Sequence, residues 1–483
     1  MSQAVGAGAE TLVQRARPAT LGLVLAKHGV LMPLLFGPPL VWAVIEGAHA
    51  LALALAGPLG LGLALSAAVW RIALPRDLRG VEAMATIALL FLFAAALSVP
   101  AFMVLGLPPA AALFEAMSAM TTTGLSMARD PDSWPFAAHV LRAWMQWCGG
   151  LAMATAVLAL VLGPGPVARE MGKVGIDDRN RLTSARSQAR ALLGAYTLIT
   201  LIFAGAIGLA IGHAGEGLVL ALSAVSTGGF APRSDSLASY DTLGQSLVIL
   251  ASVAGAVSLL AYVQVLNKGL VWLVRSPSVR RVALCCAICA TLLGGAIFAL
   301  GPGVPFGATY LNLLSAMSTA GFSVSAMPAA PALLLLFVGV MVVGGDRGST
   351  AGGLKIWRIA IAARAGRHAL TLPRLPDRAV SPLRYRGDTI SDGFLVMLVG
   401  LTALYTLTAA AIWALLLSLG YPPLPALFDT ISTLSTVGLG TGVIDPDLPP
   451  ATQLVLTAGM WLGRLEFIAV LVLILPRTWA TRP

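Results

Sequence analysis

Charged side chains are scarce in this sequence. Asp, Glu, Lys and Arg together make up 11% of the 483 residues, whereas hydrophobic residues make up 58%, and the mean hydropathy is +0.87. A water-soluble domain contains about 25% charged residues, so the composition excludes that class and indicates a polytopic membrane protein. The chain has room for about ten spanning helices of ~20 residues each, plus short re-entrant pieces.

Histidine and cysteine are also few. The five histidines are scattered over different loops and helix ends, and no Ser-His-Asp or metal-ligating cluster can be built from them. We therefore predict no catalytic residues, no enzyme and no organic cofactor. The four cysteines, Cys148, Cys285, Cys286 and Cys289, lie in apolar stretches without other metal ligands, so we interpret them as small buried hydrophobic residues.

The net charge of +10 does not indicate a nucleic-acid partner, because the basic residues concentrate in the linkers 164–190, 268–281 and 355–386. The segments on the opposite side contain Arg129 and Arg233 and few other cations. Cytoplasmic loops of membrane proteins are enriched in Lys and Arg. The linkers are therefore predicted to be cytoplasmic, in a multi-pass protein of the inner membrane that has lipids and no nucleic acid as partners.

One short motif, Ser-(Ala/Thr)-x-(Ser/Thr)-Thr-x-Gly, occurs at 118–124, 223–229, 315–321 and 432–438. The fourth copy continues as Thr-Val-Gly-Leu-Gly, one residue away from the Thr-Val-Gly-Tyr-Gly of potassium-channel filters. The spacing of the copies indicates a unit of roughly 100 residues that is repeated four times in one chain.

These residue types suit a filter for a dehydrated cation. A filter strand aims successive backbone carbonyls at one axis, where they replace the water shell of the ion, and glycine reaches backbone angles closed to other residues. The alternative, helix packing through small residues, would not place one motif before each of four chain reversals. The predicted potassium-binding residues are Thr121, Thr122, Thr123, Gly124, Ser226, Thr227, Gly228, Gly229, Ser318, Thr319, Ala320, Gly321, Ser435, Thr436, Val437 and Gly438.

Each motif follows a short apolar piece between two full spans, which is typical of a re-entrant pore helix. The predicted spanning, pore and return helices are 83–105, 109–120 and 138–162 in repeat one, 190–212, 216–225 and 244–266 in repeat two, 282–300, 306–317 and 330–360 in repeat three, and 393–419, 424–434 and 451–475 in repeat four. All four repeats then enter the membrane in one orientation, with the filters open to the outside and the repeat linkers cytoplasmic.

The sequence thus predicts an all-α polytopic membrane protein with four helix–pore helix–helix repeats in a pseudo-fourfold arrangement around one pore. This arrangement differs from the inverted repeats of many secondary transporters. Two further apolar runs, 19–45 and 50–70, form an N-terminal two-helix hairpin without a filter segment. The predicted domains are a cytoplasmic tail (1–18), the hairpin (19–75) and the pore repeats 76–170, 171–275, 276–386 and 387–483.

Glycine occupies half of the positions 344–353 within the third return helix, which a regular helix tolerates only at considerable cost. We predict a flexible loop that crosses the permeation path and gates it; the alternative is a kinked helix packed against a neighbour. Arg464 interrupts the last apolar run at a cost of about 2.5–3.5 kcal/mol and needs water or a partner. The candidates are Asp346, Glu466 and the carbonyls of the loop, and Asp346 is also close enough to pair with Arg347. The predicted gate residues are Gly344, Gly345, Asp346, Arg347, Gly348, Ser349, Thr350, Gly352, Gly353 and Arg464.

In combination, these features resemble the Trk/Ktr/HKT superfamily of potassium transporters, and in particular its TrkH-like potassium uptake subunits. Residues 146–150 (Gln-Trp-Cys-Gly-Gly), 348–355 and 463–466 (Gly-Arg-Leu-Glu) resemble that family's Q-W-x-G-G sequence, its intramembrane gating loop and its final-helix signature. The resemblance implies a homodimer with one pore per subunit, gated by a cytoplasmic nucleotide-binding ring of the TrkA or KtrA kind. The family usually has small uncharged residues where this chain has Asp346 and Arg347.

Two functions remain open from the sequence: potassium-selective, channel-like uptake, and a potassium symporter coupled to sodium or protons. Coupling would favour a buried acidic group near the filters, and Glu115 and Asp429 on the pore helices are the nearby candidates. Both are also well placed to stabilise their pore helices or to hold neighbouring backbone. Met117, Met120 and Met317 on the pore helices are expected to pack rather than to bind ions.

Overall fold

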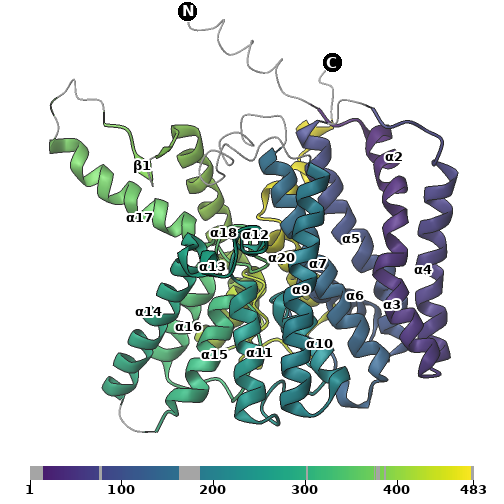
Figure 1. The fold of residues 1–483 in the computed structure, drawn as a ribbon. Coiled ribbons are helices and arrows are strands. Elements are labelled where there is room, and N and C mark those ends of the chain that lie inside the picture. Colours follow the sequence, from purple (N-terminus) through teal and green to yellow (C-terminus); the bar gives the residue numbers. More distant parts are fainter. Residues whose placement is uncertain are drawn as a thin grey trace, which may run out of the picture.

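The computed structural model describes residues 15–75, 79–162, 185–300, 303–374, 376, 381–385 and 388–479. Most of the predicted tail (1–14) and of the basic linker after repeat one (163–184) therefore lies outside the described residues. The chain is an all-α polytopic membrane protein, as predicted (Figure 1). Six described helices are long and apolar enough to cross a membrane, or eight if each of two bent pairs is one span. Two short strands, β1 (Arg384–Tyr385) and β2 (Asp388–Thr389), pair antiparallel.

The N-terminal hairpin lies at one side of the molecule (Figure 1) and consists of α2 (Pro18–His28), the 3-10 turn η1 (Gly29–Leu31), α3 (Met32–Ile45) and α4 (His49–Ala68). Glu46, in the turn between α3 and α4, accepts hydrogen bonds of 2.7 Å from the backbone amides of Phe136 and Ala137. These amides begin helix α7, where backbone donors have no intrahelical acceptor. The carboxylate therefore caps α7 and ties the hairpin to repeat one.

The four repeats follow in sequence, each with a long helix, a short pore helix and a return. Repeat one contains α5 (Gly80–Val104), α6 (Pro109–Met120), the 3-10 turn η2 (Pro131–Ser133) and α7 (Phe136–Leu162). Repeat two contains α9 (Ala185–Ile211), α10 (Ala214–Val225), α11 (Thr242–Gly255), α12 (Leu259–Lys268) and α13 (Val271–Arg275). Repeat three contains α14 (Pro277–Leu300), α15 (Phe306–Ser318), α16 (Pro331–Val343), α17 (Ile356–Thr371) and η4 (Leu372–Arg374). Repeat four contains α18 (Asp392–Ser418), α19 (Pro423–Leu434), α20 (Pro450–Arg464), α21 (Ile468–Ile474) and η5 (Pro476–Thr478).

The prediction of one continuous return helix in repeat two is wrong, because α11 and α12 meet at an angle of 91°. The carbonyl oxygens of Gly255 and Ala256 accept hydrogen bonds from the amides of Thr350 (3.3 Å) and Asp346 (3.0 Å). These two donors belong to the glycine-rich loop of repeat three. Since the last carbonyls of α11 are bound by this distant segment, the helix ends there instead of continuing.

The last return helix is also broken, contrary to the prediction of one helix over 451–475: α20 and α21 meet at 119°. Glu466 and Phe467 at the bend have φ angles of 53° and 65°. The amide of Phe467 donates a 3.0 Å hydrogen bond to the carbonyl of Leu462, which closes α20 with a Schellman-type turn. Arg464, the last residue of α20, therefore lies at a bend and not in the middle of a straight span.

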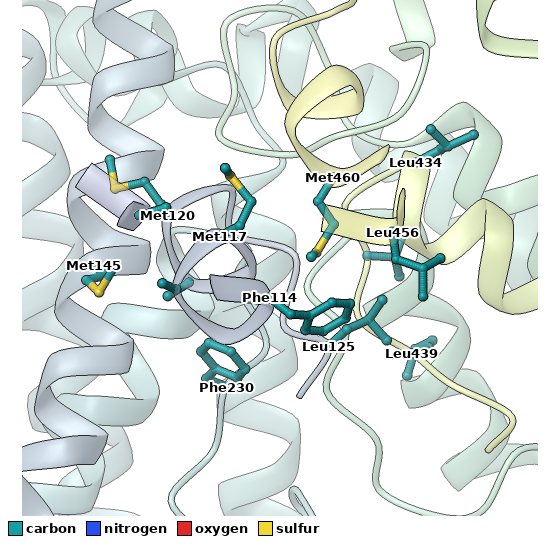
Figure 2. Close-up of a cluster of buried hydrophobic side chains, with 14 of the residues drawn as sticks. Phe114, Met117, Met120, Leu125, Met145, Phe230, Leu434, Leu439, Leu456 and Met460 are labelled. Atoms are coloured by element: carbon teal, nitrogen blue, oxygen red, sulfur yellow. The ribbon is translucent and has the colours of Figure 1, made fainter. Parts of the chain in front are cut away.

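A buried hydrophobic cluster surrounds pore helix α6, and Figure 2 shows Phe114 and Met117 of α6 beside Met460 of α20. The side chains of Met117 and Met120 are 1% and 6% exposed, and Met317 on α15 is 1% exposed. All of them lie among apolar side chains. The expectation that the pore-helix methionines pack against neighbours is confirmed.

Candidate functional site

All four pore helices end in the same way, at a threonine in the left-handed region. The φ angles of Thr122, Thr227, Thr319 and Thr436 are 54°, 56°, 56° and 49°. The backbone amide of the residue after each threonine donates a hydrogen bond to the backbone carbonyl of the first serine of the motif. The pairs are Thr123–Ser118 (2.9 Å), Gly228–Ser223 (2.7 Å), Ala320–Ser315 (2.9 Å) and Val437–Ser432 (2.8 Å). This is the Schellman turn, in which glycine is the usual left-handed residue. A β-branched residue there costs about 1–2 kcal/mol, and its fourfold recurrence indicates a functional constraint.

The motif glycines bring the four segments into a closed ring. Gly124, Gly229, Gly321 and Gly438 have φ angles of 88°, 82°, 75° and 98°. A Cβ atom added to each would collide with a carbonyl oxygen of the next segment, in the pairs Gly124–Gly228, Gly229–Ala320, Gly321–Val437 and Gly438–Thr123. The fourth contact returns to the first segment, so the four segments surround one axis. Glycine is required here both by the φ angle and by the close approach of the neighbouring backbone.

The threonine hydroxyls below this ring differ in their hydrogen bonds. Thr227 donates to the carbonyl of Ser226 at 2.6 Å, and Thr319 accepts from the amide of Gly352 at 2.7 Å. The hydroxyls of Thr122 and Thr436 are buried and have no hydrogen-bond partner within the described part of the chain. These two hydroxyls thus differ from those of Thr227 and Thr319, which are bound within the protein.

The glycine-rich loop, residues 344–353, lies directly against the filter segments at the point where they leave the pore helices. A Cβ atom on Gly352 would collide with the carbonyl oxygen of Ser435 and the hydroxyl of Thr436. The hydroxyl of Thr350 donates to the carbonyl of Val225, the last residue of α10, at 3.0 Å. Together with the bond from Gly352 to Thr319, these contacts connect the loop to repeats two, three and four.

Charged residues hold the loop from the other side. Arg464 donates a 2.6 Å hydrogen bond to the carbonyl of Thr350, and Lys355 donates to the carbonyl of Ala351. Asp346 forms a 2.6 Å ion pair with Arg281 of α14.

Further contacts fix the first half of the loop. Arg347 places its guanidinium 4.9 Å from the centre of the Trp357 ring. The amide of Leu259, which begins α12, donates to the carbonyl of Gly348 at 2.9 Å. The loop therefore contacts both sides of the bend in repeat two, the end of α11 and the start of α12.

The structure confirms one expected partner of Arg464, a loop carbonyl, and corrects the expected carboxylate partners. Asp346 and Glu466 were the candidates for Arg464, but the ion pair of Asp346 goes to Arg281 and that of Glu466 goes to Arg358. Arg464 instead donates one hydrogen bond to a loop carbonyl, and its Nε and Nη2 atoms have no hydrogen-bond partner within the described residues. Glu466 takes a different direction from Arg464 because the chain bends by 119° between them.

Glu115 and Asp429 hold the backbone that follows their own filter segments. Glu115 accepts a 2.9 Å hydrogen bond from the amide of Met127 and pairs with Arg142 at 3.1 Å. Asp429 accepts from the amides of Thr441 (2.8 Å) and Ile444 (3.0 Å). The expectation that both carboxylates hold neighbouring backbone is confirmed.

The loops that follow the four motifs are linked between repeats. Asp132 accepts hydrogen bonds from the amide (2.8 Å) and the hydroxyl (2.6 Å) of Ser234, and Arg129 pairs with Asp447. The hydrogen bond from the Ser234 hydroxyl is the main reason why the pKa of Asp132 lies below its usual value. These links join repeat one to repeats two and four after the motifs.

The sequence matches the TrkH family, described as cation transport proteins, over residues 98–268 and 308–479. An uncharacterized cation transporter of Methanocaldococcus jannaschii is 26% identical over 370 residues, which are 75% of this chain and 75% of that protein. The Trk system potassium uptake protein TrkH of Escherichia coli K12 is 26% identical over 383 residues, 76% of this chain and 79% of that protein. The crystal structure of the potassium transporter TrkH from Vibrio parahaemolyticus has the same fold, with a TM-score of 0.80 and 23% identity over 95% of this chain and 98% of that one.

The family match spans more than half of the chain and includes all four filter motifs and the glycine-rich loop. Its members are cation transporters, which makes this chain a transporter and not an enzyme. The described fold, with four segments closed around one axis, agrees with that role. The chain therefore belongs to the TrkH family of cation transport proteins.

Proposed function

We propose that this protein takes up potassium across the inner membrane through one selective pore formed by its four filter segments. The observation on which the proposal depends is the closed ring of glycine contacts, in which each segment lies against the next. Such a ring holds the neighbouring carbonyl oxygens at a fixed separation, which is what binding of a dehydrated cation requires. The ion is expected to bind the carbonyls and hydroxyls of the sixteen residues predicted from the motifs, with the free hydroxyls of Thr122 and Thr436 at the inner end.

The glycine-rich loop is proposed to be the gate. It lies between the filter and the side at which the basic linkers are predicted, and Gly352 is in contact with Ser435 and Thr436 of the fourth segment. A switch element needs two backbone arrangements of similar energy, and a loop rich in glycine provides them. The alternative of a simple packing kink does not explain why the loop contacts the filter segments of repeats two and four as well as that of its own repeat.

Channel-like passage is favoured over a symporter coupled to sodium or protons. Coupling was expected to use Glu115 or Asp429, but both are held by backbone amides, and Glu115 is also paired with Arg142. A carboxylate that holds the backbone of the filter is poorly suited to bind and release a second ion in each cycle. The driving force for uptake is then the membrane potential.

The relatives named as Trk system potassium uptake proteins support potassium as the ion, and they imply a regulatory partner. We infer that the pores assemble as a homodimer and that a cytoplasmic nucleotide-binding ring of the TrkA or KtrA kind acts on the linker side. In this orientation the filters open to the outside and the basic linkers lie in the cytoplasm.

Tracer flux in proteoliposomes, together with growth of cells that lack their own potassium uptake systems, tests the proposal. We expect rubidium-86 influx that exceeds sodium-22 influx, depends on the membrane potential and persists without a sodium or proton gradient. Equal rubidium and sodium fluxes would refute potassium selectivity. Rubidium influx that stops when the sodium or proton gradient is removed would instead establish the symporter.

A further inference from the structure

Three pore helices use the same side-chain contact to hold the segment that follows the filter. Glu115, Asn312 and Asp429 each lie three residues before the first serine of their motif, and we call them the tether residues. Each accepts a hydrogen bond from the amide twelve positions later in its own repeat: Glu115 from Met127 (2.9 Å), Asn312 from Val324 (2.8 Å) and Asp429 from Thr441 (2.8 Å). All three side chains are fully buried. The shared spacing shows that the contact belongs to the repeat unit and not to one place in the chain.

Repeat two lacks both halves of this contact. The residue at the tether position is Leu220, and the residue twelve positions later is Pro232. Leucine has no acceptor, and proline has no backbone N–H to donate. Since donor and acceptor are absent together, neither is left without its partner, and the second filter segment needs support from elsewhere.

Gln146 of the return helix α7 provides that support from outside repeat two. Its amide nitrogen donates a 2.5 Å hydrogen bond to the carbonyl of Gly228, and its amide oxygen accepts a longer one, 3.4 Å, from Phe230. A Cβ atom on Gly228 would collide with the amide group of Gln146. The other three segments have Thr123, Ala320 or Val437 at the position of Gly228, so the Gln146 amide occupies space that a filter side chain fills elsewhere.

A second contact from α7 reaches the same segment. The guanidinium of Arg142 lies 3.8 Å from the centre of the Phe230 ring and pairs with the tether residue Glu115 at 3.1 Å. The tether of repeat one is therefore connected through Arg142 to the filter segment of repeat two. Gln146 and Arg142 are four residues apart and lie on the same face of α7.

The return helices of repeats one, two and four can be compared at a shared glycine contact. A Cβ atom on Gly149, Gly255 or Gly463 would collide with the carbonyl at the end of the pore helix in the same repeat. Three residues before these glycines stand Gln146, Ser252 and Met460. Among these three positions, a glutamine occurs only at Gln146, and its side chain contacts the filter segment of repeat two, the one without a tether.

We infer that Gln146 is a positioning residue for selectivity: it holds the carbonyl of Gly228 at the radius that suits potassium, in place of the missing tether. This inference rests on the proposed potassium function. A carbonyl oxygen that accepts a hydrogen bond from Gln146 cannot move inward to bind the smaller sodium ion without losing that bond. Loss of this bond should change the ratio of the two ions and not the overall rate.

Two single variants and one double variant of the full-length protein test this role by tracer flux in proteoliposomes. Gln146→Met introduces the residue that repeat four has at this place and removes the hydrogen bond. Gly228→Ala adds a Cβ atom that collides with the Gln146 amide. The double variant Gln146→Ser/Gly228→Ala removes this collision, because it places at these two positions the residue types that Ser252 and Ala320 have at the equivalent ones. We expect each single variant to lower the rubidium-to-sodium flux ratio about three- to tenfold, the effect of one hydrogen bond. The double variant relieves the collision but still lacks the hydrogen bond and the tether, so its ratio should stay about as low as that of Gln146→Met and fall no further.

The matched control is Gln453→Met. Gln453 is also a buried glutamine in a return helix, but its amide nitrogen donates to the carbonyl of Leu448, outside the filter. It should leave the flux ratio unchanged. If Gln453→Met lowered the ratio as much as Gln146→Met, or if Gln146→Met left it at the wild-type value, the inference would be refuted; additive single effects in the double variant would refute it as well.

A binding measurement keeps the test valid if a variant carries too little flux. Gln146→Met has a side chain of similar length that cannot donate to Gly228, so it should weaken the thermal stabilisation of the purified protein by potassium relative to that by sodium. Unchanged relative stabilisation in this variant would overturn the inference. If the wild-type protein itself were neither stabilised by potassium nor selective for rubidium over sodium in flux, the proposed function would be wrong, independently of Gln146.

Discussion

The guanidinium of Arg464 lies 2.6 Å from the carbonyl oxygen of Thr350, and this hydrogen bond joins the last return helix to the glycine-rich loop. The hydroxyl of the same threonine binds the carbonyl of Val225, at the end of the second pore helix. Thr350 is thus fixed from both sides, by Arg464 and by the base of a filter segment. Arg464 is itself 2% exposed, so this carbonyl is an important part of the compensation for its buried charge.

Replacement of Arg464 by Ala should open the pore in the absence of a regulatory partner. Hydrogen bonds to charged groups contribute about 1.5–3 kcal/mol, and 1.4 kcal/mol corresponds to a factor of ten. Rubidium flux into proteoliposomes should therefore rise about tenfold or more. The rubidium-to-sodium ratio should stay near the wild-type value, because Arg464 does not contact the filter ring.

Arg464→Lys is the control, since it keeps the charge and a donor near Thr350 and should raise the flux less than Arg464→Ala. If Arg464→Ala were well expressed and folded but had the flux of wild type, the loop would be a packing kink and the gate would lie elsewhere.

Gly438→Ser should weaken discrimination between potassium and sodium. The φ angle of Gly438 is 98°, and a Cβ atom there would collide with the carbonyl of Thr123. A left-handed angle alone costs an ordinary residue about 1–2 kcal/mol, so we expect the ratio of rubidium to sodium flux to fall about tenfold.

Gly440→Ser, two residues further on, is the matched control. Within the described residues, the nearest atom to an added Cβ at Gly440 is the Asp429 carboxylate oxygen at 3.8 Å, an ordinary van der Waals distance. Its flux ratio should match that of wild type. Serine variants at Gly124, Gly229, Gly321 and Gly438 that all kept the wild-type ratio would show that the glycine ring is not the selective element.

The filter motifs could be recognised from the sequence because each is local, continuous and repeated four times. The two bends in the return helices could not be recognised in that way. Residues 244–266 are apolar enough to continue as one helix, and only the loop that follows about 80 residues later takes the carbonyls of Gly255 and Ala256. Such a break is decided by tertiary contacts, which override local helix preference.

The charge pairs show the same limit. Arg281 and Asp346 are 65 positions apart in the sequence, and several other cations were equally plausible partners for that carboxylate. The tether residues, in contrast, left a signal that was missed: Glu115, Asn312 and Asp429 occupy one position of the repeat. Alignment of the four repeats on the motif serine would have revealed this position, and also the exception at Leu220.

The filter should hold one or two strong potassium sites, fewer than a symmetric channel filter. After the motif glycine, the chain continues with Leu125, Phe230, Phe322 or Leu439, and these side chains are 5%, 3%, 0% and 2% exposed. They are packed in the hydrophobic core, so the segments are anchored there instead of extending the selective ring. A density map of the protein in rubidium should show one or two strong peaks on the axis. Four peaks of equal height would contradict this expectation.

Gly352→Ala should displace the loop from the filter and raise basal flux. Gly352 is in contact with the carbonyl of Ser435 and the hydroxyl of Thr436, and its amide donates to Thr319 at 2.7 Å. An added methyl group has no space in this arrangement, so the loop has to move away from the fourth segment, which weakens the closed state. We expect a severalfold rise in rubidium flux without a partner and a flux ratio within about twofold of wild type. Gly339→Ala in α16, where an added Cβ meets no atom within 4 Å, should behave as wild type. Gly352→Ala protein that folds normally but has unchanged flux would show that contact between the loop and the filter does not limit permeation.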